Sequence, residues 1–379
     1  MIISGLRADE ALAVVSRLRP ATPRGQTFSA VLAEWDGQET ADELVRRADE
    51  ALVPGEGGRP GPGAARQGCH PRGVAPSHSV VGTVNPHPAT CHEMGRNVGG
   101  LPLLDKVALG DHVCWTIDDD ATRMEAIAAF VRAGLLARHK VIYSGDEPEA
   151  VLDGLERHGV GTQAALGEGS LRAVTAESSY LAGGVFDPEI TMALWRAEIA
   201  RARAQGHPGI RVVGDMTWAS RQIPGAEHLA WYEAQVNTVF MEGYVAGVCA
   251  YDRRRFDPLR LRQLSFAHPG AAGTRAPFEP ESSLRARRTR NPYGVRLTGE
   301  VDLSNRDALR AVIDHLFEGE PAATVEVSGL TFVDTAAARI LVDAAADGPV
   351  RLVGCSPPLR KLLAFHGADR VAGLTVVYR

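Results

Sequence analysis

Hydrophobic and polar positions follow two alternating periodicities between residues 101 and 268. Short apolar runs rich in β-branched residues predict strands, and longer amphipathic stretches predict helices. The predicted strands cover residues 112–117, 140–144, 171–173, 210–216 and 244–250. The predicted helices cover residues 121–137, 147–158, 187–204, 227–240 and 258–266. Because strands that alternate with helices are typical of a parallel sheet covered on both faces, we predict an α/β domain.

The same pattern predicts where this domain would bind a ligand. Ligands of such sheets bind beyond the carboxyl ends of the strands, which here are residues 116–120, 145–147, 215–218 and 251–252. Trp218 follows a predicted strand, and we expect it to contact the ligand. Asp215 and Glu233 would act as polar anchors beside Tyr251. The competing interpretation is that these aromatic side chains belong to the core.

A second pattern lies near the C-terminus, where a strand precedes Asp334 and Thr335. Residues 335–346 are rich in Ala, Ile and Leu and contain no Gly or Pro, which predicts a helix. A phosphate on Thr335 would meet free backbone N–H groups and the positive end of the helix dipole. It would also add about two negative charges beside Asp334. The alternative is that Thr335 is only a helix cap.

Residues 282–379 resemble a STAS domain, the fold of anti-sigma factor antagonists. The matching motifs are Gly299-Glu300-Val301-Asp302-Leu303, Val333-Asp334-Thr335 and Val353-Gly354-Cys355-Ser356-Pro357. The resemblance implies a smaller α/β domain whose partner is an anti-sigma factor or a switch-type serine/threonine kinase. It implies phosphorylation at Thr335 and partner contacts at Asp302, Ser304, Asp334 and Thr335. Many members have two hydroxyl residues and then a glycine, whereas here Ala336 and Ala337 follow Thr335.

The order of segments in residues 101–268 is similar to that of RecA-like ATPases. Residues 210–215 lie where those enzymes have their metal-associated acid. Yet the first strand is followed by Ile117-Asp-Asp-Asp-Ala-Thr122 rather than by a glycine-rich loop with a lysine. Three carboxylates at that turn would repel a triphosphate. We therefore expect a RecA-like sheet without ATP hydrolysis, and we predict that the protein is not an enzyme.

The same region resembles the MEDS sensory domain of methanogen and methylotroph regulators more closely. The matching motifs are Gly110-Asp-His-Val-Cys-Trp115, Gly214-Asp-Met-Thr-Trp218, Trp231-Tyr-Glu233, Cys249-Ala-Tyr-Asp252 and His268-Pro269. The resemblance implies a sensor of a small hydrocarbon-derived ligand. The candidate ligand contacts are His112, Cys114, Asp215, Trp218, Glu233, Cys249 and Tyr251.

His112 and Cys114 lie two residues apart and therefore share one face of a strand. In a RecA-like order the last predicted strand lies close to the first, so that Cys114 approaches Cys249. With Cys249 or His268 this group would suit a metal, a haem or a thiol-reactive ligand. Alternatively, both cysteines are small core residues and His112 is a hydrogen-bonded buried imidazole. Two nearby soft ligands are too few for a closed metal site, so we predict no metal and no cofactor.

The remaining segments are short or poor in hydrophobic residues. Residues 1–58 resemble the C-terminal end of a GGDEF domain through a strand and an Ala-Asp-Glu-Ala-Leu helix, but the signature loop is absent, so we predict a remnant without cyclase activity. Residues 59–100 are dense in Gly, Pro, His and Ser, which predicts a disordered linker. Residues 269–281 are rich in Pro and Gly and predict a second linker.

Composition narrows the possible partners and the compartment. The 379 residues carry a formal net charge of -5, and the most basic run, residues 285–290, is expected to be a solvated face rather than a nucleic-acid site. No stretch has the length of a transmembrane helix, so neither nucleic acid nor membrane is predicted as a partner. Five scattered cysteines suit the reducing cytoplasm.

These observations favour a cytoplasmic signal-transduction protein, with a sensory domain that regulates an anti-sigma factor antagonist-like output. An enzyme using the central cleft, either a transferase or a degenerate nucleotide hydrolase, is the first alternative. Turnover that depends on Asp215 would identify it. A scaffold of a stress-sensing complex that does not switch is the second alternative.

Overall fold

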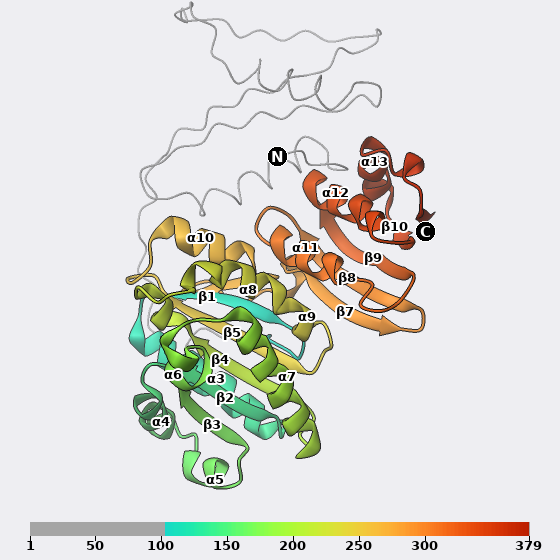
Figure 1. Ribbon diagram of the computed structural model, residues 1–379. Coiled ribbons are helices and arrows are strands. Elements are labelled where there is room, and N and C mark those ends of the chain that lie inside the picture. The colour runs from blue at the N-terminus through green and yellow to red at the C-terminus, as the bar shows by residue number, and fades with distance from the viewer. Residues whose placement is uncertain (1–102, 379) are drawn as a thin grey trace, which may run out of the picture. The chain divides into compact units, whose positions relative to one another are not determined.

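The computed structural model describes residues 103–378 (Figure 1). The predicted N-terminal remnant, residues 1–58, and the predicted linker, residues 59–100, lie outside the described residues. Within the described part of the chain, no helix is both long enough and apolar enough to cross a bilayer.

The first domain is built on a parallel six-stranded sheet with the order β3-β2-β4-β5-β1-β6. Its strands are β1 (His112–Ile117), β2 (Lys140–Gly145), β3 (Leu171–Thr175), β4 (Ile210–Asp215), β5 (Val245–Asp252) and β6 (Gly270–Gly273). The central strands are buried along almost their whole length, as expected when helices cover both faces. The predicted α/β class with a central parallel sheet is confirmed.

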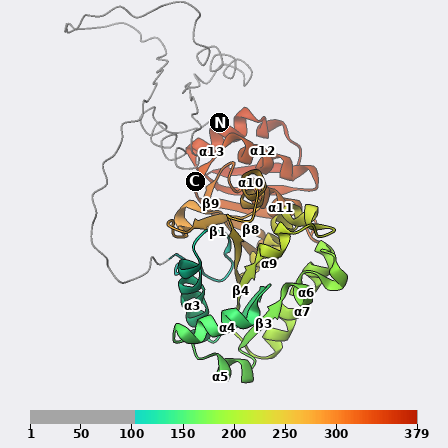
Figure 2. The ribbon, with the colours of Figure 1, turned by 90° about the vertical axis from the view of Figure 1, so that its left-hand side faces the viewer.

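Helices cover both faces of this sheet, as the view in Figure 2 makes clear. One core cluster joins the sheet to α3 (Asp120–Leu136), α4 (Pro148–Arg157) and α5 (Thr162–Gly167). The other cluster joins the opposite face to α6 (Ala176–Ser179), α7 (Pro188–Ala204), α8 (Leu229–Gln235), α9 (Asn237–Phe240) and α10 (Pro258–Phe266). Short 3-10 turns link these helices at η2 (Ala182–Gly184), η3 (Met216–Ser220) and η4 (Ala226–His228).

The segment predicted as a second linker supplies the edge strand β6. Its residues 270–273 pair with β1, and Phe278 in the following turn is buried. A Cβ atom at Gly270 would lie 2.5 Å from Ser283 Oγ and 2.6 Å from Phe278 Cε2. Glycine therefore fits position 270 because the surroundings leave no room for a side chain there.

The second domain has a five-stranded mixed sheet with the order β11-β10-β9-β8-β7, in which the β7–β8 pair is antiparallel. The strands are β7 (Arg285–Arg290), β8 (Tyr293–Val301), β9 (Ala323–Val333), β10 (Val350–Cys355) and β11 (Leu374–Tyr378). Its core is formed with α11 (Arg306–Asp314), α12 (Thr335–Asp343) and α13 (Pro357–Phe365). The 3-10 turns are η5 (Pro280–Ser282), η6 (Ala344–Ala346) and η7 (Ala368–Arg370). The predicted smaller α/β domain is confirmed.

Polar contacts connect the segments around β1 with the second sheet. The buried carboxylate of Asp111 accepts hydrogen bonds from Arg285 Nε at 2.8 Å and Arg285 Nη2 at 2.7 Å. Arg287 donates to the Leu109 carbonyl, and Arg288 pairs with Glu242 and Glu318. The basic run of residues 285–290 was expected to be a solvated face, but these arginines instead bind acceptors within the protein.

Candidate functional site

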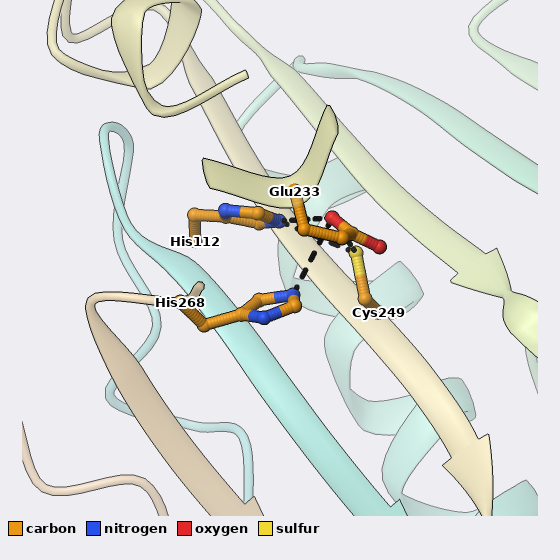
Figure 3. A group of neighbouring side chains, drawn as sticks. All are labelled: His112, Glu233, Cys249 and His268. Carbon is orange, nitrogen blue, oxygen red and sulfur yellow. Dashed lines mark hydrogen bonds and ion pairs between the residues drawn. The ribbon is translucent and has the colours of Figure 1, made fainter. Parts of the chain in front are cut away.

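Four side chains with metal-binding donor atoms converge in the first domain: His112, Glu233, Cys249 and His268 (Figure 3). We call these four residues the donor group. They come from the start of β1, from α8, from the middle of β5 and from the turn after α10. One donor atom from each lies within 4.8 Å of the corresponding atoms of the other three. Segments far apart in the sequence thus bring two imidazoles, a thiol and a carboxylate together.

The distances in this group are short and similar. His112 Nε2 lies 3.3 Å from Glu233 Oε2 and 3.3 Å from Cys249 Sγ. His268 Nε2 lies 3.5 Å from Glu233 Oε2, and Cys249 Sγ lies 3.6 Å from the same oxygen. His112, Glu233 and His268 are buried, whereas Cys249 keeps partial exposure.

Asn237 fixes the tautomer of His112. The Asn237 amide nitrogen lies 2.9–3.0 Å from the carbonyl oxygens of Glu233, Ala234 and Ala267, so the amide oxygen must face the other way. That oxygen lies 2.9 Å from His112 Nδ1 and therefore accepts its N–H. As a consequence, Nε2 is the nitrogen of His112 that faces Glu233 and Cys249.

His268 is oriented in the same manner. Its Nδ1 lies 2.8 Å from the Leu264 carbonyl oxygen, which can only accept, so Nδ1 carries the proton. Nε2 of His268 is buried and receives no hydrogen bond from the described residues. Burial, and then the neighbouring His112, lower the pKa of His268 to about 4.

Tyr251 completes the surroundings of Glu233. The Tyr251 hydroxyl donates to Glu233 Oε1 at 2.6 Å. Burial opposes the charge of Glu233, but His268, His112 and Tyr251 outweigh it and hold the pKa of Glu233 below its usual value. Burial, together with Glu233, raises the pKa of the Cys249 thiol well above its usual value. The group therefore holds one ionised carboxylate and one protonated thiol.

A small cavity adjoins this group. It has room for about one water molecule. His112, Glu233 and Cys249 line its polar side. Aromatic and aliphatic side chains line the rest, including Tyr180, Trp195, Tyr232, Val236 and Phe240. The cavity lies against the face of the sheet that α7–α10 cover, rather than at the carboxyl edge where the sequence predicted the ligand.

The structure brings four of the seven predicted ligand contacts together: His112, Glu233, Cys249 and Tyr251. Cys114 lies opposite Cys249 in the register of β1 and β5, as a RecA-like order predicts, but its side chain is fully buried and outside the donor group. Burial raises the pKa of the Cys114 thiol.

Asp215 and Trp218 belong elsewhere. Asp215 forms an ion pair with Arg123 and accepts a hydrogen bond from the Tyr143 hydroxyl at 3.1 Å. Trp218 is fully buried between Tyr180 and Phe186, at ring distances of 5.5 and 5.1 Å. Trp218 is thus a core residue of η3 rather than part of the donor group.

Sequence reasoning missed Asn237 as a site residue and named His268 without placing it among the ligand contacts. A signal for Asn237 is present in the sequence, because it lies four residues after Glu233 and therefore on the same side of a helical segment. The role of Leu264 depends on a backbone carbonyl, which no side-chain pattern reveals.

The predicted partner-binding residues of the second domain lie at one edge of its sheet. Val301 and Val333 are paired in the ladder of β8 and β9, so Asp302 and Asp334 follow neighbouring strand ends. Asp302 Oδ1 accepts hydrogen bonds from the backbone N–H and hydroxyl of Ser304, at 2.7 and 2.6 Å. Leu303 between them is 44% exposed, which gives this edge an apolar contact.

Asp334 and Thr335 begin α12. Asp334 is the cap of the helix and accepts the Ala337 N–H at 2.7 Å, while burial raises the pKa of its carboxyl. Thr335 is partly exposed, but its hydroxyl oxygen is buried and has no hydrogen-bond partner among the described residues. The Thr335 carbonyl accepts the Nε2–H of His366 at 2.8 Å.

Comparisons with known proteins agree with this two-part organisation. Residues 111–269 match the family model "MEthanogen/methylotroph, DcmR Sensory domain" (MEDS), and residues 284–377 match "Mlab, STAS domain". A search of curated proteins found no significant match.

Solved structures with similarity to the chain include two archaeal proteins. A KaiC-like protein of Pyrococcus horikoshii OT3 has 12% identity and a TM-score of 0.35, over 54% of this chain and 88% of that one. The flagellar accessory protein FlaH of Methanocaldococcus jannaschii has 8% identity and a TM-score of 0.33, over 53% and 82%. From the two family matches, the chain carries a MEDS domain followed by a STAS domain.

Proposed function

We propose that this protein is a cytoplasmic signal-transduction protein, in which the MEDS domain recognises a small ligand and the STAS domain passes the signal to a protein partner. The partner proposed is an anti-sigma factor or a switch-type serine/threonine kinase. The family description of the first domain as sensory supports this proposal. So does the buried polar group beside an apolar cavity, which is an arrangement typical of small-molecule recognition.

One contact carries the proposed coupling between the domains. His268 of the donor group is followed by Pro269, whose carbonyl accepts a hydrogen bond from Asn305 Nδ2 at 3.1 Å. Asn305 Oδ1 in turn accepts the backbone N–H of Asp302 at 3.1 Å. A shift of His268 on ligand binding would therefore act through Pro269 and Asn305 on the loop that presents Leu303 and Ser304.

The helices that bear the donor group support the same route. Glu233 lies on α8 and Asn237 begins α9, and both helices pack against α11. Ala234, Ala267 and Ala311 form a small buried cluster at this contact. α11 begins directly after Asn305. A movement of α8 would therefore also act through α11 on the sheet edge that bears Asp302, Leu303 and Asp334, which we call the partner edge.

Phosphorylation of Thr335 is the proposed regulatory step. Because its hydroxyl oxygen is buried, a kinase would reach it only after the side chain turns outward. A phosphate would then face the N-terminus of α12 and place two further charges beside Asp334. An acidic or apolar partner surface bound at Leu303 would be repelled.

Recognition without catalysis is the proposed role of the central domain. Asp119 accepts the Thr122 N–H at 2.7 Å and thereby occupies the N-terminus of α3, where a phosphate would bind in a nucleotide hydrolase. Asp120 pairs with Arg254 at 2.6 Å. Nucleotide turnover by the full chain that is lost in Asp215→Asn would support the enzyme instead.

The test of this function is affinity capture of partners from the native host, with the full chain as bait. We expect wild-type protein to retain a kinase or anti-sigma factor, and Thr335→Asp to retain at least about tenfold less of it, through charge repulsion. Thr375→Asp is the control, because it adds the same charge at an exposed position at the opposite end of the sheet.

Two outcomes would contradict the proposal. Equal retention of the same partner by wild type and Thr335→Asp would contradict the proposal that a charge at residue 335 controls partner binding. A large complex that forms regardless of residue 335 would favour a scaffold. Mass spectrometry of protein purified from the host, searched for phosphate on Thr335, checks the modification itself.

A further inference from the structure

The four donor atoms of the group face one another in the protein interior. Asn237 Oδ1 and the Leu264 carbonyl oxygen lie 2.9 and 2.8 Å from the Nδ1 atoms of His112 and His268, so Nε2 is the nitrogen of each ring that faces the group. Both Nε2 atoms lie near Glu233 Oε2, at 3.3 and 3.5 Å. His268 Nε2 is buried and has no hydrogen-bond partner among the described residues. A buried polar atom without a partner is unfavourable, and a bound cation would supply that partner.

The spacing of the donor atoms fits one metal ion. Zinc binds nitrogen and carboxylate oxygen at about 2.0–2.2 Å and thiolate sulfur at about 2.3 Å. In a tetrahedron such bonds separate neighbouring donors by about 3.3–3.6 Å. The four short separations in this group run from 3.3 to 3.6 Å. Four of the six separations between the donor atoms therefore match a tetrahedral site, and all six lie within 4.8 Å.

The surroundings support the same conclusion. Imidazoles that bind a metal through Nε2 almost always donate Nδ1–H to a carbonyl or carboxylate, which fixes the ring. Asn237 Oδ1 and the Leu264 carbonyl accept those protons from His112 and His268. Tyr251 holds the remaining oxygen of Glu233 at 2.6 Å. Each of these three ligands thus has a partner that orients it.

We propose that His112, Glu233, Cys249 and His268 bind one divalent transition-metal ion of the zinc class. The ligand atoms are the two Nε2 atoms, Glu233 Oε2 and Cys249 Sγ. Nitrogen and thiolate donors favour zinc, cobalt or iron(II) over magnesium and calcium, which prefer oxygen. This site goes beyond the proposed signalling function and is measurable without any partner.

Charge balance fits a buried site. When the ion binds, the Cys249 thiol releases its proton to solvent and the S–H bond is replaced by a metal–sulfur bond. Two positive charges then meet one carboxylate and one thiolate, so the site is neutral. A neutral site avoids the large cost of an uncompensated charge in the protein interior. The partial exposure of Cys249 and the adjoining cavity give the ion and the proton a route.

The experiment is metal analysis of the untagged full chain after removal of metal and reloading with Zn²⁺ or Co²⁺. We expect one tightly bound ion per chain and, for Co²⁺, the charge-transfer absorption of a cobalt–thiolate bond. Cys249→Ala is expected to lose the part of that absorption that comes from one equivalent of Co²⁺ in this site. Asn237→Ala is expected to weaken binding about 10- to 100-fold, because the orienting partner of His112 is lost.

The controls separate this site from other metal-binding residues. Cys114→Ala removes the neighbouring thiol, which lies opposite Cys249 but outside the donor group, and should retain the cobalt–thiolate absorption. Several His and Cys residues between 69 and 92 could also bind metal. The Cys249→Ala variant retains all of these residues, so the metal that it still binds measures their contribution.

Folding of each variant is checked by circular dichroism, so that a lost absorption is read on folded protein. His268→Gln, which removes a nitrogen ligand and leaves the thiol in place, provides a second variant and should lose stoichiometric binding. The proposal is wrong if folded wild-type protein binds no ion at one equivalent. It is equally wrong if Cys249→Ala loses none of the cobalt–thiolate absorption of wild type.

Discussion

At the scale of single residues, the orientation of the donor group depends on side chains that carry no charge. Asn237 uses its amide nitrogen on three carbonyls, and this fixes which nitrogen of His112 faces the cavity. The sequence identified His112 and Cys249 as candidates because imidazole and thiol chemistry is visible in residue types. It could not predict the tautomer, since that follows from contacts with residues 237 and 264, which only the fold brings close.

His366 provides a pH prediction at this scale. Burial lowers the pKa of His366 from 6.5, although the hydrogen bond to the Thr335 carbonyl and the charge of Asp343 act in the opposite direction. A histidine with a lowered folded pKa binds its proton more readily when unfolded. Its contribution to stability is therefore present above pH 6.5 and is lost as the pH falls below that value.

The measurement is the urea midpoint of the full chain between pH 7.5 and 5. We expect the wild-type midpoint to fall with pH more steeply than that of His366→Gln, whose side-chain amide can still donate to the Thr335 carbonyl but does not titrate. Identical pH profiles for the two proteins would show that His366 does not contribute. His228→Gln is a matched control at an exposed histidine, and it should follow wild type.

At the scale of secondary-structure elements, periodicity predicted most of the central domain. The strand at 112–117 and the helix at 258–266 have the predicted bounds. Strand β6 was missed because Gly270-Ala-Ala-Gly273 has no hydrophobic alternation and is typical of a linker. These residues form a strand because they pair with β1 and pack against Phe278, and the local sequence reveals neither contact.

The tight packing of β6 leads to a prediction at this scale. Gly270→Ala should lower the free energy of unfolding by about 1–3 kcal/mol, because its Cβ would lie 2.5 Å from Ser283 Oγ. Gly273→Ala is the matched control in the same strand, since a Cβ there would meet no atom closer than 3.8 Å. Urea unfolding followed by tryptophan fluorescence compares the two. Equal stability of both variants would contradict the close packing at Gly270.

At the scale of the whole molecule, the family resemblances predicted the order of the two domains, and the family models confirm it. The sequence could not predict the contacts that connect them. The sequence pattern predicts that Arg285 belongs to a solvated basic run, yet Arg285 binds the buried Asp111, which directly precedes His112. Such a pair depends on two segments 174 residues apart in the chain.

The most direct test of the coupling is hydrogen–deuterium exchange of the full chain, with and without one equivalent of Zn²⁺. We expect slower exchange in residues 229–240 and 264–269 around the donor group, and altered exchange in residues 300–306 and 334–338 at the partner edge. Cys249→Ala should show neither change. Protection confined to the donor group, with unchanged exchange at the partner edge, would contradict the claim that ligand binding at the donor group changes the conformation of the STAS domain.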